Sequence, residues 1–153
     1  MIRWRKSHRG FTLAELVMVV ALIALLSAMA LPVAKFTVKR EKEAQLRLAL
    51  RQIRTAIDEY KRMSDQGLIP VKIGGEGYPE SLEELVEGVE IVGQDTKMRF
   101  LRRIPLDPMT RDDWVLRSYQ DDPDSTTWGG ENVYDVRTSS EGTAIDGTKY
   151  TDW

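Results

Sequence analysis

An uninterrupted apolar segment near the start of the chain constrains its structure more than any other feature. Residues 11–31 include a single charged side chain, Glu15. An α-helix rises about 1.5 Å per residue, so this segment is long enough to cross the hydrocarbon core of a bilayer, which is about 30 Å thick. The residues before it include four basic side chains and no acidic one: Arg3, Arg5, Lys6 and Arg9. The sequence therefore predicts a targeting and membrane-spanning segment.

The residue types available for chemistry are few. The chain of 153 residues has no Cys, and its one His is His8. With His8 outside the folded part, Cys/His zinc sites, thiolate nucleophiles and a Ser-His-Asp triad are excluded, and oxygen ligands remain. The chain has 22 Lys and Arg against 24 Asp and Glu, a formal charge of −2. This balance gives no electrostatic case for a nucleic-acid partner, and we expect neither such a partner nor enzyme activity.

An ordinary secretory signal peptide is one alternative for the apolar segment. Ala28 and Ala30 form the A-x-A pattern of a cleavage site at its end. Such peptides have an apolar core of about 7–15 residues, whereas this segment is longer and carries Glu15 near its beginning. A carboxylate at the centre of a membrane helix costs about 3 kcal/mol on translocon scales, and less near an end. The presence of Glu15 therefore indicates a function for that side chain.

The start of the apolar segment resembles a known processing signal. The run Gly10-Phe11-Thr12-Leu13-Ala14-Glu15 is similar to the class III signal of type IV pilins and pseudopilins. The resemblance implies that a prepilin peptidase cleaves between Gly10 and Phe11 and N-methylates Phe11. It also implies assembly roles for Glu15, which would meet the terminal amine of a neighbouring subunit, and for Pro32, which would loosen the helix. Physical chemistry agrees for Glu15, because an ionised carboxylate in hydrocarbon needs a cation beside it.

The resemblance divides the chain into three parts. We expect a cleaved cytoplasmic leader over residues 1–10, a transmembrane and assembly helix over 11–34, and a periplasmic domain over 35–153. Charge counting alone does not orient the span, because basic residues also follow it at Lys35, Lys39, Arg40 and Lys42. The expected orientation, with the leader in the cytoplasm, therefore rests on the resemblance.

Beyond Pro32 the apolar residues change to a helical period. They recur at alternating steps of four and three, at Leu46, Leu50, Ile53, Ile57 and Tyr60. This spacing predicts one helix from about residue 11 to residue 63, with its second half packed on a small domain. Coiled-coil pairing is the alternative, but five positions fall short of the three or four heptads that would favour it.

Charged residues on the same helix predict two exposed ion pairs. Glu43 with Arg47, and Asp58 with Arg62, have the i,i+4 spacing of pairs on the outer side of a helix.

The remainder of the chain predicts short elements. Gly67 is expected to end the long helix, and the capping box at residues 81–84 to begin a short helix that ends near Gly88. A second short helix is expected over about 95–103. Residues 114–119 and 133–137 are predicted strands. The expected fold class is α+β, with a long N-terminal helix packed against a small C-terminal antiparallel β-sheet, as in pilins.

The C-terminal third resembles the major pseudopilin, the G type, of type II secretion systems. The resemblance lies in residues 103–108, Trp114, residues 134–136 and a tail rich in Gly and Asp. It implies a calcium site in the tail, with Ser139, Glu141 and Asp146 as candidate ligands. Residues 121–153 carry a formal charge of −6, and Ca²⁺ accepts six to eight oxygen ligands in flexible geometry. An acidic, solvated tail without bound metal is the alternative.

Three functions follow from these patterns. The first is a structural subunit of a type II secretion pseudopilus, anchored by one span in the bacterial inner membrane. Its expected partners are further copies of itself, the prepilin peptidase, the inner-membrane secretion platform and minor pseudopilins. The second is a type IV pilin or minor pseudopilin used in adhesion, motility or DNA uptake. The third, from another class, is a single-span membrane-anchored metal-dependent enzyme.

Overall fold

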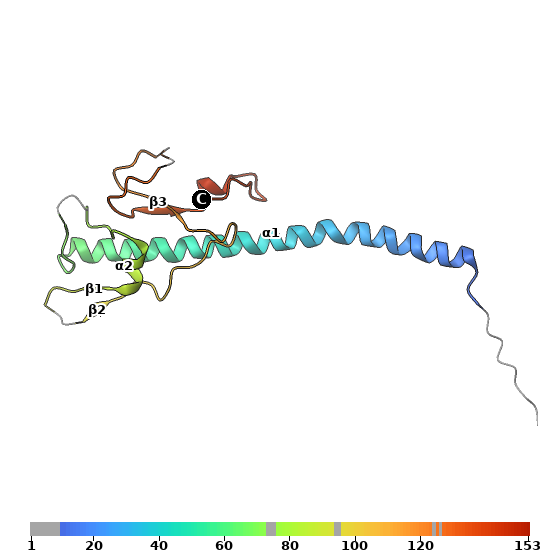
Figure 1. The fold of residues 1–153 in the computed structure, drawn as a ribbon, viewed down its shortest axis with the longest axis horizontal. Helices are drawn as coiled ribbons and strands as arrows, with labels where there is room; N and C mark the ends of the chain where they lie inside the picture. The colour runs from blue at the N-terminus through green and yellow to red at the C-terminus, as the bar shows by residue number, and fades with distance from the viewer. Residues whose placement is uncertain (1–9, 73–75, 94–95, 124, 126) are drawn as a thin grey trace, which may run out of the picture. The chain divides into compact units, whose positions relative to one another are not determined.

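A computed structural model describes residues 10–72, 76–93, 96–123, 125 and 127–153, with only the backbone described for residues 29–32. The chain divides into two compact units, Met1–Lys39 and Arg40–Trp153. The helices are α1 (Leu13–Asp65), α2 (Leu82–Glu87) and the 3₁₀-helix η1 (Tyr150–Asp152). The strands are β1 (Val89–Glu90), β2 (Lys97–Met98), β3 (Val115–Arg117) and β4 (Asp135–Arg137) (Figure 1). The fold is α+β, as predicted.

Helix α1 ends where the sequence indicated. Gly67 has a φ of 72°, the left-handed conformation that glycine adopts most easily. Its N–H donates to the Ser64 carbonyl at 2.9 Å, and the Leu68 N–H donates to the Met63 carbonyl at 3.1 Å. These two bonds form a Schellman motif, which satisfies carbonyl groups at the end of the helix.

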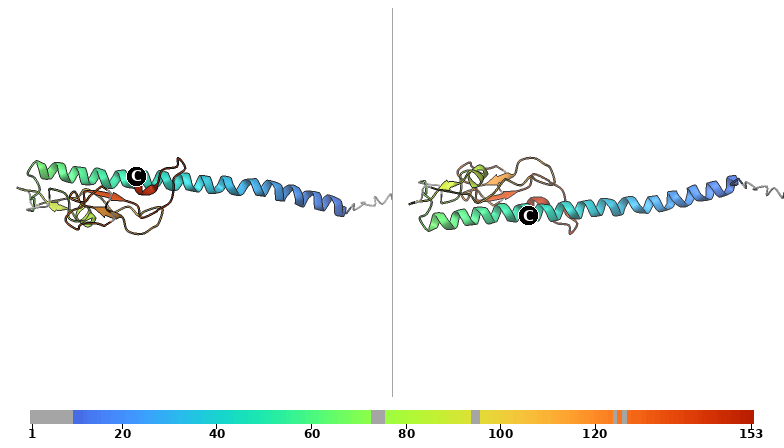
Figure 2. Two further views of the ribbon diagram at one scale, coloured as in Figure 1. Left: turned by 90° about the horizontal axis from the view of Figure 1, so that it is seen from above. Right: turned by 90° about the horizontal axis from the view of Figure 1, so that it is seen from below.

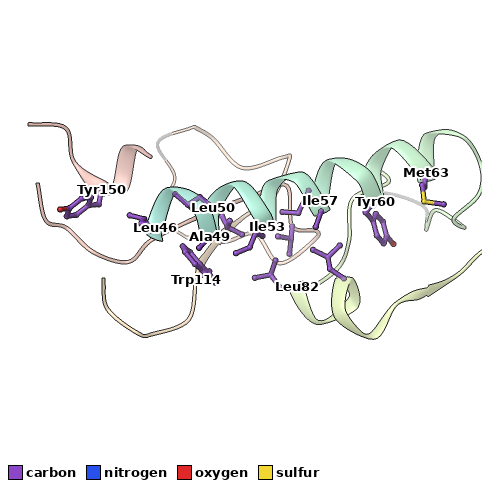
Figure 3. Packing of buried hydrophobic residues seen from close by; sticks show 14 of the residues in the cluster. Leu46, Ala49, Leu50, Ile53, Ile57, Tyr60, Met63, Leu82, Trp114 and Tyr150 are labelled. Carbon is purple, nitrogen blue, oxygen red and sulfur yellow. The ribbon is translucent and has the colours of Figure 1, made fainter. Parts of the chain in front are cut away.

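The predicted apolar stripe of α1 forms the centre of the core. Its five residues, Leu46, Leu50, Ile53, Ile57 and Tyr60, are each at most 5% exposed. They belong to one core cluster with side chains from later in the chain, among them Leu82, Leu85, Trp114, Val136 and Tyr150. Figure 3 labels Leu82, Trp114 and Tyr150 beside the stripe. Figure 2 shows the later elements lying along this half of the helix. The domain's own core therefore covers the face that a coiled coil would have used.

Helix α2 begins at the predicted capping box. The Ser81 hydroxyl accepts from the Glu84 N–H at 3.4 Å, and the Glu84 carboxylate accepts from the Glu80 N–H at 2.8 Å. At the other end, the Gly88 N–H donates to the Glu84 carbonyl at 3.0 Å. Leu82 and Leu85 point into the core from this helix.

The helix predicted over about 95–103 was wrong for the residues described there. Lys97–Met98 forms β2, which pairs antiparallel with β1 through Val89 opposite Met98. Residues 97–100 alternate between exposed and half-buried side chains, the period of a strand. In addition, the N–H groups of Phe100 and Leu101 both donate to the Leu85 carbonyl at 2.9 Å. These tertiary hydrogen bonds take the place of helical ones.

The two strands predicted near the C-terminus form a second antiparallel pair. Leu116 of β3 lies opposite Val136 of β4 in the register. Beyond the strands, a side chain joins the two segments: the Ser118 hydroxyl donates to the Asn132 carbonyl at 2.9 Å. Among the described residues the strands thus form two separate two-stranded sheets.

Asp107 ties the loop before β3 to the end of β4. Its side chain is fully buried and accepts from the Met109 N–H at 2.7 Å and the Thr110 hydroxyl at 3.2 Å. A third hydrogen bond comes from the Thr138 hydroxyl. In the same loop, the Trp114 indole donates to the Pro105 carbonyl at 2.7 Å. Asp107, Pro105 and Trp114, which contributed to the resemblance in this region, therefore have structural roles here.

Candidate assembly and processing site

The first turn of α1 holds Glu15 in a reciprocal contact with Thr12. The Thr12 N–H and the Thr12 hydroxyl each donate to Glu15 Oε2 at 2.9 Å, and the Glu15 N–H faces the Thr12 hydroxyl at 3.3 Å. This geometry is a capping box, which satisfies N–H groups that the start of a helix leaves unpaired. This role of Thr12 was not predicted, although Thr12-Leu13-Ala14-Glu15 has the required spacing.

The Gly10–Phe11 peptide bond lies outside the helix. The first helical residue is Leu13, and the Phe11 side chain is 85% exposed. Apart from Gly10 and its chain neighbours, no atom of the described residues lies within 4 Å of the position that a Cβ on Gly10 would occupy. The described side of this junction is therefore exposed.

The described residues 13–28 of α1 are exposed on every side of the helix. An 18-residue window of this helix has a mean hydropathy of 2.7 and none of it is buried. A helix that is apolar all round requires an apolar environment, either lipid or neighbouring helices. This helix is therefore long and apolar enough to cross a membrane.

The helix continues through Pro32, the second residue with a predicted assembly role. The Pro32 side chain lies outside the description, and loosening of the helix there stays a prediction.

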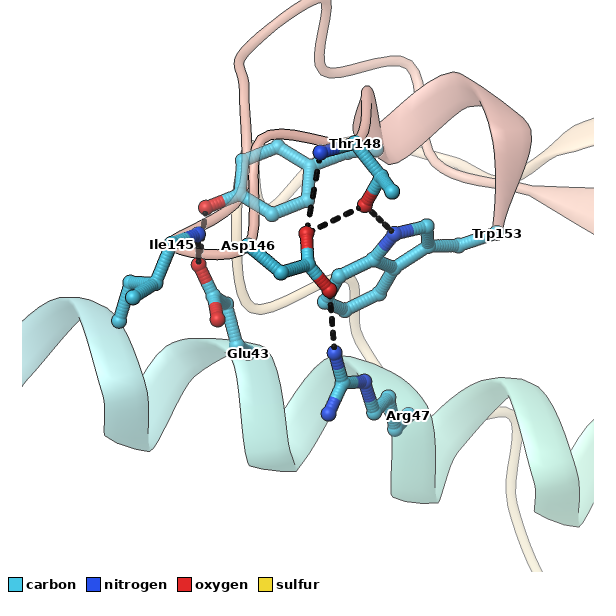
Figure 4. Close-up of polar contacts among 7 residues, drawn as sticks. Glu43, Arg47, Ile145, Asp146, Thr148 and Trp153 are labelled. Atoms are coloured by element: carbon cyan, nitrogen blue, oxygen red, sulfur yellow. Dashed lines mark hydrogen bonds and ion pairs between the residues drawn. The ribbon is translucent and has the colours of Figure 1, made fainter.

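Two of the three candidate calcium ligands, Ser139 and Asp146, contact other residues of the fold. The Ser139 hydroxyl donates to the Thr110 hydroxyl at 3.2 Å, and Glu141 is exposed. Asp146 Oδ1 accepts from the Thr148 hydroxyl at 2.7 Å and from its N–H at 3.0 Å, and Oδ2 lies 3.4 Å from Arg47 Nη2 (Figure 4). These hydrogen bonds from Thr148, together with the charge of Arg47, lower the pKa of Asp146. Within the described ranges, no group of three or more acidic side chains could hold a metal ion.

We propose that this loop binds calcium, and thermal unfolding tests the proposal. Melts of the 35–153 fragment should show a higher midpoint in millimolar Ca²⁺ than in chelator, because a ligand at a hundredfold excess over its Kd stabilises a fold by about 2.7 kcal/mol. The increase should vanish in Asp146→Ala and persist in Asp152→Ala, which removes another exposed acid of the tail. Coincident midpoints for the unmodified fragment would remove the calcium site.

The predicted ion pair between Glu43 and Arg47 was wrong. Glu43 is only 6% exposed, and its Oε1 accepts from the Tyr150 hydroxyl and from the Ile145 N–H, both at 2.9 Å (Figure 4). Arg47 instead faces Asp146 and lies over the Trp153 ring at 4.2 Å. An exposed i,i+4 pair contributes only a few tenths of a kcal/mol, whereas an unpaired buried donor costs about 1–3 kcal/mol. Glu43 and Arg47 therefore contact residues near the C-terminus and not each other.

The pair predicted between Asp58 and Arg62 was also wrong, since Arg62 pairs with Glu59, three residues earlier.

Arg54 of α1 adds a further contact to the C-terminal residues. Its Nε donates to Asp135 Oδ1 at 2.7 Å, and its Nη2 donates to the carbonyls of Val136 at 3.1 Å and Trp153 at 2.7 Å. Glu43, Arg47 and Arg54 of α1 thus all contact residues 135–153.

Burial and the hydrogen bond to Glu43 raise the pKa of Tyr150 to about 12, so this hydroxyl stays a donor at neutral pH.

Comparison with known proteins supports the interpretation of the N-terminal region. Residues 5–31 match the family model of the prokaryotic N-terminal methylation motif. No curated protein and no solved structure matches the chain significantly. Together with the exposed apolar helix, the motif supports a type IV pilin-like protein that is anchored in a membrane by a single span. Such a leader implies processing by a prepilin peptidase.

Proposed function

We propose that the chain is a structural subunit of a type II secretion pseudopilus, with no catalytic role. Copies of it would polymerise through the N-terminal helix in the inner membrane and extend into the periplasm to drive protein export across the outer membrane. This proposal is supported by the match to the methylation motif over residues 5–31, together with the position of Glu15 in the first turn of an exposed apolar helix. The prepilin peptidase, the inner-membrane platform and minor pseudopilins are the proposed partners.

The geometry of Glu15 supports a contact with a neighbouring subunit. Both hydrogen bonds from Thr12 reach Oε2, and Oε1 has no partner in the described part of the chain. Cleavage after Gly10 would create an amine at Phe11. The amine of a second copy would give Oε1 the cation that a carboxylate in hydrocarbon requires.

A polar contact of this kind has a larger share in the association of helices in a membrane than in water. Helices in lipid gain little hydrophobic energy by associating, so close packing and polar pairs select their register. Among the described residues 13–28, Glu15 is the one charged side chain. It is therefore the strongest candidate to fix the axial position of one subunit against the next.

Replacing Glu15 by Gln tests the contact and keeps the cap. The amide oxygen of Gln can still accept from Thr12, but it carries no charge for a neighbouring ammonium. Because a polar contact between membrane helices contributes about 1–2 kcal/mol, we expect roughly a tenfold loss of assembly in Glu15→Gln, and a similar loss in Glu15→Ala. Assembly can be measured as the yield of chemically crosslinked oligomers of the full-length chain in membranes.

Glu41→Ala is the matched control, since Glu41 is an exposed residue of α1 beyond the apolar segment. All variants should still insert and be cleaved. Full crosslinking and filament yield in Glu15→Gln would contradict a charged contact. Loss in Glu15→Ala alone would assign Glu15 to the cap.

A further inference from the structure

A groove rich in arginine lies in the unit Arg40–Trp153. It has a volume of about 760 Å³ and lies between the C-terminal half of α1 and the segment that runs from the end of β2 to Arg103. Phe100 and Leu101 are half-buried in its lining. Four arginines that line it are exposed: Arg51, Arg99, Arg102 and Arg103. The groove thus combines an apolar lining with several positive charges.

Most of this positive charge is uncompensated. Within the described residues, the side chains of Arg51, Arg102 and Arg103 have neither a hydrogen bond nor an ion pair. The Arg99 side chain makes one hydrogen bond, to the Glu87 carbonyl at 3.4 Å. The acidic residue in the lining, Glu59, pairs with Arg62. Guanidinium groups bind carboxylates in a planar, two-point geometry. The groove is therefore suited to an acidic partner that also carries apolar surface.

The loop between β3 and β4 has the complementary chemistry. Residues 118–134 include four acidic and no basic side chains. Asp122 and Glu131 are exposed, and their carboxylates have no partner among the residues described. Tyr119 is 55% exposed and Trp128 is 37% exposed. Unlike Asp121, which accepts from the Ser118 N–H at 2.7 Å, Asp122 and Glu131 are available for a partner.

We propose that the arginine groove of one copy receives the β3–β4 loop of a second copy. In Figure 1, β3 lies on one side of α1, and β1 and β2 lie on the other, so the groove and the loop are different surfaces of the same unit. Contacts between two different surfaces are heterologous and generate open filaments when the rotation does not close a ring. The inference rests on the proposed function, and adds to it the surfaces that join the periplasmic domains.

A disulfide between copies tests the proximity of the two surfaces. Gln52 lines the groove, Thr127 is an exposed residue of the loop, and the chain has no Cys of its own. Full-length Gln52→Cys and full-length Thr127→Cys, produced together with different tags in membranes and then oxidised, should form a mixed disulfide. Gln45→Cys, two helical turns earlier on α1 and outside the groove, should form at least tenfold less with Thr127→Cys.

Charge reversal tests whether the arginines and the acids carry the contact. Arg102→Glu with Arg103→Glu, in the copy that carries Gln52→Cys, should reduce the mixed disulfide at least tenfold. Asp122→Arg with Glu131→Arg, in the copy that carries Thr127→Cys, should restore it to within twofold. Lys42→Glu with Lys149→Glu gives the same change of net charge at exposed positions outside the groove, and should leave the disulfide unchanged.

The result distinguishes this inference from the proposed function. If crosslinked oligomers of the full-length chain form but the mixed disulfide does not, the subunits assemble and the groove assignment is wrong. A mixed disulfide that survives Arg102→Glu with Arg103→Glu, or that the loop reversal fails to restore, overturns the charge pairing. If crosslinked oligomers are absent as well, the proposed function fails together with the inference.

Discussion

Replacement of Glu43 by Ala should destabilise the folded domain by at least about 2 kcal/mol. The change leaves two donors, the Tyr150 hydroxyl and the Ile145 N–H, without the acceptor that now lies 2.9 Å from each. A buried donor without a partner costs about 1–3 kcal/mol. Urea unfolding of the 35–153 fragment should show a lower midpoint with an unchanged slope, because the surface exposed on unfolding is nearly the same.

Two variants separate this effect from the loss of a charge on the helix. Glu43→Gln keeps a side-chain oxygen as acceptor and should lose much less stability than Glu43→Ala. Glu41→Ala removes an exposed carboxylate two residues away, and should change stability by no more than about 0.5 kcal/mol. If Glu43→Ala matched the unmodified fragment in midpoint, Glu43 would not hold the C-terminal residues on α1.

Ile53→Ala should cost about 2–5 kcal/mol, the range measured for large-to-small substitutions in protein cores. Ile53 is fully buried at the centre of the apolar stripe, and its neighbours Leu50 and Ile57 are at most 3% exposed. The packed surroundings cannot close the resulting cavity without strain. The same urea measurement on the 35–153 fragment gives the effect.

Leu48→Ala is the control for the effect of the substitution on α1 itself, because Leu48 is 56% exposed on the same helix. It should change stability by less than about 0.5 kcal/mol. Unchanged unfolding of Ile53→Ala, combined with a loss of oligomer, would show that the stripe pairs helices of different copies and does not form the core.

Sequence patterns were sufficient to predict the elements that depend only on residues close to them in the chain. The step of four and three residues from Leu46 to Tyr60 depends only on helix geometry, and all of those positions are buried. Gly67 and the capping box at residues 81–84 satisfy helix ends within a few residues of themselves, so their spacing identified them correctly.

The errors arose where distant residues decide the conformation. Residues 97–101 are held by pairing with β1 and by the Leu85 carbonyl, neither of which a local pattern reveals. Glu43 was assigned to the solvent side because Arg47 lies one turn away, whereas its partners are Ile145 and Tyr150, about a hundred residues later.

The same difference between local and distant contacts applies to the candidate site. The Gly10–Phe11 junction and Glu15 could be proposed from the sequence alone, since the motif lies within six consecutive residues, and their roles stay predictions. The bonds between Thr12 and Glu15 are also local and follow from a known spacing. The contacts of Ser139 and Asp146 could not be foreseen, because their partners Thr110 and Arg47 are supplied by the tertiary fold.

Processing at the Gly10–Phe11 bond can be measured as the intact mass of the chain recovered from membranes that contain a prepilin peptidase. We expect a product of 143 residues that begins at Phe11 and carries one added methyl group, since cleavage after Gly10 removes ten of the 153 residues. A Gly10→Val chain should keep its leader under the same conditions. A product that begins at Leu31, as a secretory signal peptide requires, or an unmodified chain that still begins at Met1, would show that the chain is not processed as a type IV pilin-like protein.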